Sequence, residues 1–84
     1  MPLELSIVTP AAPLVQTQVD TVVLPGAEGE FGVLPEHESL LAPLQEGVLS
    51  YQRGGQTHRV ELLGGFAEVT RERVTVLADG ATLR

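Results

Sequence analysis

Apolar and polar residues alternate along most of this chain with a period of two, which is the pattern of half-buried β-strands. At the start of the chain, Leu3, Leu5 and Ile7 alternate with polar neighbours, and the β-branched run of residues 21–24 ends at a Pro-Gly pair. Nine glycines and six prolines are spread through the 84 residues, so there is little room for a long helix. The pattern therefore predicts short strands separated by turns.

The spacing of these runs indicates the architecture. Further strands are expected at residues 15–19, 31–34, 40–44, 48–53, 57–63, 66–70 and 74–78. The clearest hairpin joins 48–53 to 57–63, because the glycines between them supply the positive φ that such a turn requires. Turns about every 8–12 residues are typical of an all-β fold. We therefore predict one domain over residues 1–84, a two-sheet antiparallel sandwich or flattened barrel of about 8–10 short strands.

One window has a helical alternative. Within residues 36–45, Leu40, Leu41 and Leu44 fit a period of 3.6 residues. Pro43 lies inside this window and argues against a helix, because proline lacks the backbone N–H and its ring clashes with the preceding turn. Residues 40–44 are therefore predicted to form an irregular or edge strand, and no helix longer than about two turns is expected.

Charge and composition exclude several functions. The net charge is −6, with 11 acidic residues against five arginines, so the surface repels phosphate backbones and suits a basic protein partner instead. Cysteine is absent, which excludes disulfides and thiolate metal sites. No stretch approaches the roughly 18 apolar residues of a membrane helix, and no signal peptide is expected. Any membrane association is therefore expected to run through another protein.

Candidate catalytic groups are few. His37 lies between Glu36 and Glu38, an arrangement that suits a general base or a metal ligand. The other histidine, His58, has no ligand-like spacing to it, and no serine lies in a nucleophile elbow. The glycine-rich stretch 26–32 fits neither a dinucleotide turn nor a Walker loop. We expect no catalytic residue, metal or cofactor, so a binding or structural role follows by elimination.

Four blocks of sequence resemble the epsilon subunit of F-type ATP synthases. Residues 26–41 read G-A-E-G-E-F-G-V-L-P-E-H-E-S-L-L, which is similar to the family's loop, roughly G-x-E-G-x-x-G-V-L-P-x-H-x-P-L-L. Residues 3–9 resemble the opening strand, 64–69 resemble G-G-F-x-E-V, and 74–79 resemble V-T-V-L-A-D. The blocks follow in the family's order and cover essentially the whole chain. Ser39 stands where the family usually has proline.

The resemblance implies a non-catalytic rotor subunit of the central stalk, which links the gamma subunit to the c ring and couples proton flow to ATP synthesis. It implies a peripheral position on the cytoplasmic face of a bacterial plasma (inner) membrane, through the complex. The loop implied to face the c ring holds Glu28, Gly29 and Glu30. The residues implied to lie beside the gamma-facing surface are His37, Leu40 and Leu41.

Several alternatives stay open. Leucine is usually buried, so Leu40 and Leu41 are equally well explained as core residues. The rival function is a stand-alone β-sandwich module that binds a ligand or peptide, and a third is a small hydrolase that uses His37. The family's usual C-terminal helical hairpin is missing after Arg84. The resemblance ties inhibition of hydrolysis and ATP binding to that hairpin, so neither activity is expected of this chain.

Overall fold

The computed structural model describes residues 3–84, and the regular structure within this range consists of strands alone. The strands are β1 (Leu3–Val8), β2 (Pro13–Val19), β3 (Thr21–Gly26), β4 (Gly29–Val33), β5 (Leu40–Leu44), β6 (Gly47–Arg53), β7 (Gln56–Leu62), β8 (Gly65–Val69), β9 (Arg73–Ala78) and β10 (Ala81–Leu83). The all-β prediction is confirmed. The helical alternative for residues 36–45 is wrong, because β5 occupies this window.

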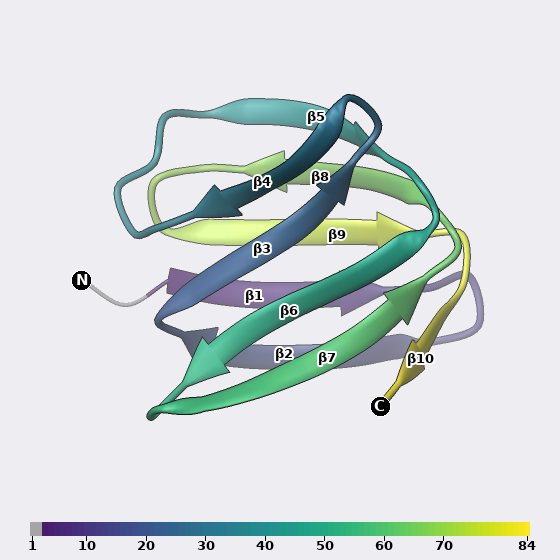
Figure 1. The fold of residues 1–84 in the computed structure, drawn as a ribbon, viewed down its shortest axis with the longest axis horizontal. Coiled ribbons are helices and arrows are strands. Elements are labelled where there is room, and N and C mark those ends of the chain that lie inside the picture. The colour runs from purple at the N-terminus through teal and green to yellow at the C-terminus, as the bar shows by residue number, and fades with distance from the viewer. Residues whose placement is uncertain (1–2) are drawn as a thin grey trace.

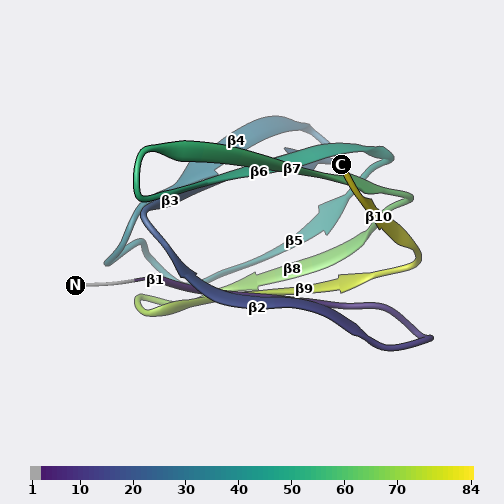
Figure 2. The same ribbon diagram turned by 90° about the horizontal axis from the view of Figure 1, so that it is seen from below.

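The strands form one continuous sheet that folds over on itself. Their order is β10-β7-β6-β3-β5-β8-β9-β1-β2, and β4 pairs with β3 beside this path. Figures 1 and 2 show two layers, with β3, β4, β6 and β7 in one and β1, β2, β8 and β9 in the other. The predicted sandwich, or flattened barrel, is therefore confirmed, and the sheet passes from one layer to the other where β3 meets β5.

Two details of the sheet differ from the prediction. β1 pairs with β9 in parallel, from Glu4 opposite Arg73 to Val8 opposite Leu77, whereas the other strand pairs are antiparallel. The period-2 pattern shows which side chains are buried but not which strand lies alongside, so it did not reveal this pairing. β10 was also missed, because its three residues are too short to show any alternation.

Aliphatic side chains fill the space between the layers. The buried apolar residues are Leu3, Leu5, Ile7, Val19, Val22, Leu24, Val33, Leu44, Leu49, Val60, Leu62, Ala67, Val69, Val74, Val76 and Ala78. Within residues 3–84 no polar or charged residue is buried. The interior therefore offers no desolvated acid or base, and functional chemistry has to lie at the surface.

The start of β8 depends on a glycine. Gly65 adopts φ of 136°, a conformation that residues with a side chain rarely adopt. A Cβ at this position would overlap the carbonyl oxygen of Leu77 and lie 2.9 Å from Cα of Ala78. Both atoms belong to the backbone of β9, so they have little freedom to move away. Gly65 therefore permits the close approach of β8 and β9.

We predict that Gly65→Ala lowers the free energy of unfolding by about 2–5 kcal/mol, because the overlap with β9 adds to the backbone strain. Gly32→Ala is the matched control, since the nearest atom to its Cβ would be the carbonyl oxygen of Val22 at 3.9 Å. Urea denaturation followed by circular dichroism measures both changes. Equal stability of the two variants would contradict the role assigned to Gly65.

Candidate functional site

The tight hairpin between β3 and β4 forms one end of the candidate site. Gly26 pairs with Gly29 across a two-residue turn, and Gly29 adopts φ of 132°. The backbone N–H of Ala27 donates a hydrogen bond to the carbonyl oxygen of Pro43 at 2.9 Å. This hydrogen bond attaches the turn to β5, so the turn and β5 keep a fixed relative position.

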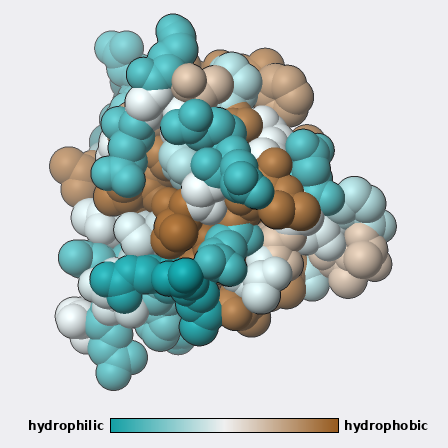
Figure 3. All heavy atoms as spheres, turned by 45° about the vertical axis from the view of Figure 1, so that its right-hand side comes forward, coloured by the Kyte–Doolittle hydropathy of each residue, from teal (hydrophilic) through white to brown (hydrophobic). Residues whose placement is uncertain are grey.

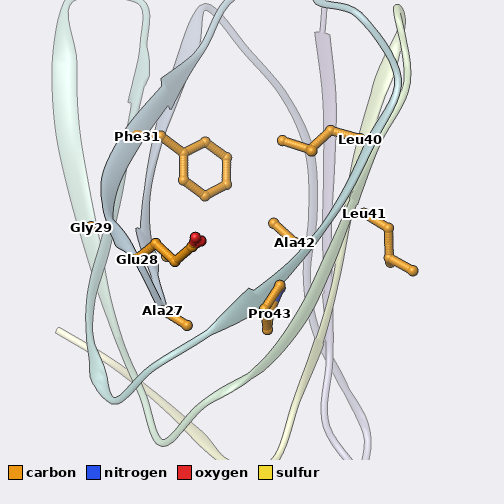
Figure 4. Close-up of a pocket in the computed structure, with 9 residues that line it drawn as sticks. Ala27, Glu28, Gly29, Phe31, Leu40, Leu41, Ala42 and Pro43 are labelled. Carbon is orange, nitrogen blue, oxygen red and sulfur yellow. The ribbon is translucent and has the colours of Figure 1, made fainter.

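β4 and β5 separate beyond this attachment. In the described part of the chain β4 pairs with β3 alone, and β5 meets β3 only where Gly26 lies opposite Leu44. A pocket of about 240 Å³ opens between the two strands (Figure 4). Its lining residues are Gly26, Ala27, Glu28, Gly29, Phe31, Leu40, Leu41, Ala42 and Pro43. The walls are almost wholly apolar, and Glu28 is the one charged residue among them.

The aromatic wall of the pocket requires the first glycine of the turn. Phe31 is half-buried and points into the space between β4 and β5, as do Leu40 and Ala42 (Figure 4). A Cβ on Gly26 would lie 2.5 Å from the backbone carbonyl oxygen of Gly29 and 2.9 Å from the Cδ1 and Cε1 atoms of the Phe31 ring. The turn backbone and the ring together therefore leave no room for a side chain at position 26.

Leu40 and Leu41 are both on the surface. Leu40 is 41% exposed and Leu41 is 69% exposed, so the alternative that both belong to the core is wrong. They lie on opposite sides of β5, because Leu40 pairs with the buried Val69 and Leu41 pairs with the exposed Glu68. Leu40 points into the pocket and Leu41 points away from it (Figure 4). A partner that contacts both leucines must reach around the edge of β5.

The two glutamates of the turn also diverge. Glu28 lies in the turn, and its side chain extends into the space between β4 and β5 (Figure 4). Glu30 follows on β4 immediately before Phe31, so the strand alternation places it on the side opposite the Phe31 ring. The ion pairs within residues 3–84 join Arg73 to Glu4 and Arg84 to Glu61, so neither turn glutamate is neutralised there.

His37 lies outside the pocket lining, in the segment between β4 and β5. Its Nδ1 atom lies 2.7 Å from the carbonyl oxygen of Glu38, and its backbone N–H donates to Leu34 at 3.3 Å. His58 lies in a different strand, where its ring stacks on Tyr51 at a centroid distance of 5.0 Å. No group of three potential metal ligands converges within residues 3–84. His37 thus makes local hydrogen-bonding contacts within this segment.

Several residues that line the pocket or lie exposed beside it were not predicted as site residues from the sequence. Phe31, Ala42 and Pro43 line the pocket, although only their neighbours were singled out. On the outer face of the second layer, Pro43 pairs with Phe66 and Phe66 pairs with Leu77. The exposed large apolar residues are Leu34, Leu40, Leu41, Leu63, Phe66, Leu77 and Leu83. Figure 3 shows apolar side chains reaching the surface between hydrophilic ones on the face that it displays.

To predict that these outer residues pair, one would have to know the strand register, which alternation alone does not give.

In the described range the chain holds no helix long and apolar enough to cross a membrane.

Four of the six residues predicted from the resemblance line one pocket: Glu28, Gly29, Leu40 and Leu41. Glu30 and His37 lie outside its lining. The two sets that the resemblance assigned to different partners therefore share one surface feature. An arrangement of apolar walls, free strand edges and one acid suits the binding of a protein segment.

Comparison with known proteins finds relatives of similar sequence. The ATP synthase epsilon chain of Nitratidesulfovibrio vulgaris (strain DP4) is 53% identical over 79 residues, which cover 94% of this chain and 59% of the relative. That of Helicobacter pylori (strain Shi470) is 46% identical over 79 residues, which cover 94% of this chain and 64% of the relative. The chain thus spans about three fifths of the length of these curated relatives.

Solved structures show the same fold. A chain of the Euglena gracilis mitochondrial ATP synthase (OSCP/F1/c-ring, rotational state 1) superposes with a TM-score of 0.90 at 28% identity, covering 98% of this chain and 53% of that one. A chain of the Tetrahymena thermophila mitochondrial ATP synthase central stalk and c-ring superposes at 0.80 with 11% identity, covering 98% and 66%, and this match supports the fold alone.

The family model described as "ATP synthase, Delta/Epsilon chain, beta-sandwich domain" matches residues 2–84. This match spans nearly every residue, and the all-strand fold and the names of the relatives agree with it. The chain therefore belongs to the family of ATP synthase delta/epsilon chains, of which it represents the β-sandwich domain.

Proposed function

We propose that this chain is a non-catalytic rotor part of an F-type ATP synthase, in which it joins the gamma subunit to the c ring and so couples proton flow to ATP synthesis. Its membership of the family and the relatives named ATP synthase epsilon chain support this proposal. The observation that carries it is the exposure of Leu40 and Leu41 on the two sides of β5, beside a pocket that no strand of residues 3–84 covers.

Burial of these two leucines against a partner would favour binding, since full burial of a leucine side chain contributes roughly 1.5–3 kcal/mol. β5 pairs with β8 along one edge. Its other edge forms no strand pairing along residues 40–42 in the described chain, because β5 meets β3 only at Leu44. We assign the gamma subunit to this surface. Its attachment holds the chain at the membrane through the complex, on the cytoplasmic face of a bacterial plasma membrane.

The c ring is assigned to the outer side of the β3–β4 turn. Glu30 and the backbone of Gly29 lie at the exposed beginning of β4. An exposed ion pair contributes only about 0.2–1 kcal/mol. This contact would therefore orient the domain on the ring and contribute little to its affinity. The apolar surface on the gamma side would contribute most of the binding free energy.

We expect Leu41→Asp to fold normally but to lose at least about fivefold in affinity for the gamma subunit, because the loss of an interface anchor costs more than about 1 kcal/mol. The free energy of unfolding should fall by only about 1 kcal/mol or less, because the new carboxylate lies on the surface but opposite Glu68 of β8. Calorimetric titration with purified gamma measures the affinity, and urea denaturation measures the stability.

The matched control for this variant is Leu83→Asp, the same change at a leucine that is 53% exposed on β10. It should bind gamma as the unmodified chain does. Failure of the unmodified chain to co-purify with gamma would contradict the proposed function, and would favour the stand-alone binding module.

We expect Glu30→Gln to weaken the attachment of the gamma–chain complex to purified c ring by about fivefold or less. The loss should disappear in concentrated salt, because salt screens interactions between exposed charges. Glu72→Gln removes the same charge from the turn between β8 and β9 and should leave the attachment unchanged. If Glu30→Gln and the unmodified chain attach equally well at low salt, the assignment of the c ring to this side of the turn is wrong.

A further inference from the structure

Glu28 is the one charged group in the pocket between β4 and β5. The remaining lining is apolar or glycine, and Phe31, Leu40 and Ala42 point into the same space (Figure 4). Within residues 3–84 the carboxylate forms no ion pair. An acid at the mouth of an apolar recess is complementary to a side chain that is aliphatic along its stem and positive at its end.

Lysine and arginine are the side chains of this kind, because they pack their methylene stems on apolar surface and keep the charge near water. A cation within about 6 Å of an aromatic ring is also attracted to the face of that ring, and Phe31 lines the pocket. The volume of about 240 Å³ lies below the roughly 300–1,000 Å³ of typical small-molecule sites. It suits one side chain better than a free ligand.

The surroundings reinforce the charge argument. Residues 26–52 contain five glutamates and neither lysine nor arginine. The rim of the pocket therefore has no cation of its own along these strands, and it would attract a basic group from outside the chain. The free edge of β5 lies next to the pocket, so an extended segment of a partner has backbone groups with which to pair.

We propose that this pocket binds a lysine or arginine side chain of the gamma subunit, with its stem between Phe31 and Leu40 and its charge on Glu28. The inference rests on the proposed function and refines it. Glu28 shares the pocket with Leu40, which faces gamma, whereas Glu30 lies on the other side of β4. The side chain of Glu28 is therefore assigned to gamma, and Gly29 and Glu30 stay with the c ring.

The test compares the affinities of Glu28→Gln and Glu72→Gln for purified gamma by calorimetry, at low and high salt. We expect Glu28→Gln to bind about fivefold more weakly at low salt, and Glu72→Gln to bind as the unmodified chain does. Phe31→Leu keeps an apolar side chain but removes the ring, and it should weaken binding further in combination with Glu28→Gln. Circular dichroism confirms that each variant is folded.

The outcomes separate the two proposals. If gamma binds Glu28→Gln as tightly as the unmodified chain, the pocket inference is wrong and the proposed function stands. If Glu28→Gln weakens binding to the c ring but not to gamma, the occupant comes from the ring and the inference is equally wrong. If the unmodified chain does not bind gamma at all, the proposed function itself fails.

A second measurement tests the pocket without any partner. Butylammonium chloride, which carries the stem and charge of lysine, is titrated into the isotopically labelled chain at up to about 100 mM, and butanol serves as the neutral control. We expect amide NMR shifts at Gly29, Phe31 and Ala42 with the cation, and smaller ones with butanol or in Glu28→Gln. Equal shifts with both probes, or none at these residues, would overturn the charge recognition.

Discussion

The join between β3 and β5 is the constraint on which the rest of this structure depends. Among residues 3–84 the sheet passes from one layer to the other at one place, where Gly26 lies opposite Leu44. Backbone hydrogen bonds from Ala27 to Pro43 and from Gln45 to Pro25, each 2.9 Å long, hold it. Pro43 takes part in this join only as a hydrogen-bond acceptor, through its carbonyl oxygen. A proline is therefore tolerated at this position of β5, although it has no backbone N–H to donate.

The pocket is a direct result of that join. Two layers that meet at one corner must separate away from it, so β4 and β5 diverge and leave the interior exposed between them. Phe31 is half-buried and Leu40 is 41% exposed, and both point into the gap that the divergence leaves. The exposure of these two side chains thus follows from the topology of the sheet.

Much of the fold could be predicted from the sequence, because apolar and polar residues alternate within each strand and so identify it without knowledge of its neighbours. The hairpin of residues 47–62 and the strand that includes Phe31 were predicted in this way. The parallel pairing of β1 with β9 was not readable, since alternation carries no information on strand direction. The exposure of Leu41 was left open between a core and a surface position, because it depends on what covers the strand. The direction of the Glu28 side chain was not predicted, because it depends on the conformation of a turn.

The position of β1 has a consequence for how the chain acquires its structure. β1 lies between β2 and β9, so β1 and β2 leave the ribosome well before the strand that pairs with the second edge of β1. Pairings between such distant segments slow folding, because the intervening loop must close first. During synthesis the β1–β2 hairpin therefore presents an unpaired edge, and this period is when the nascent chain is most open to aggregation or to help from a chaperone.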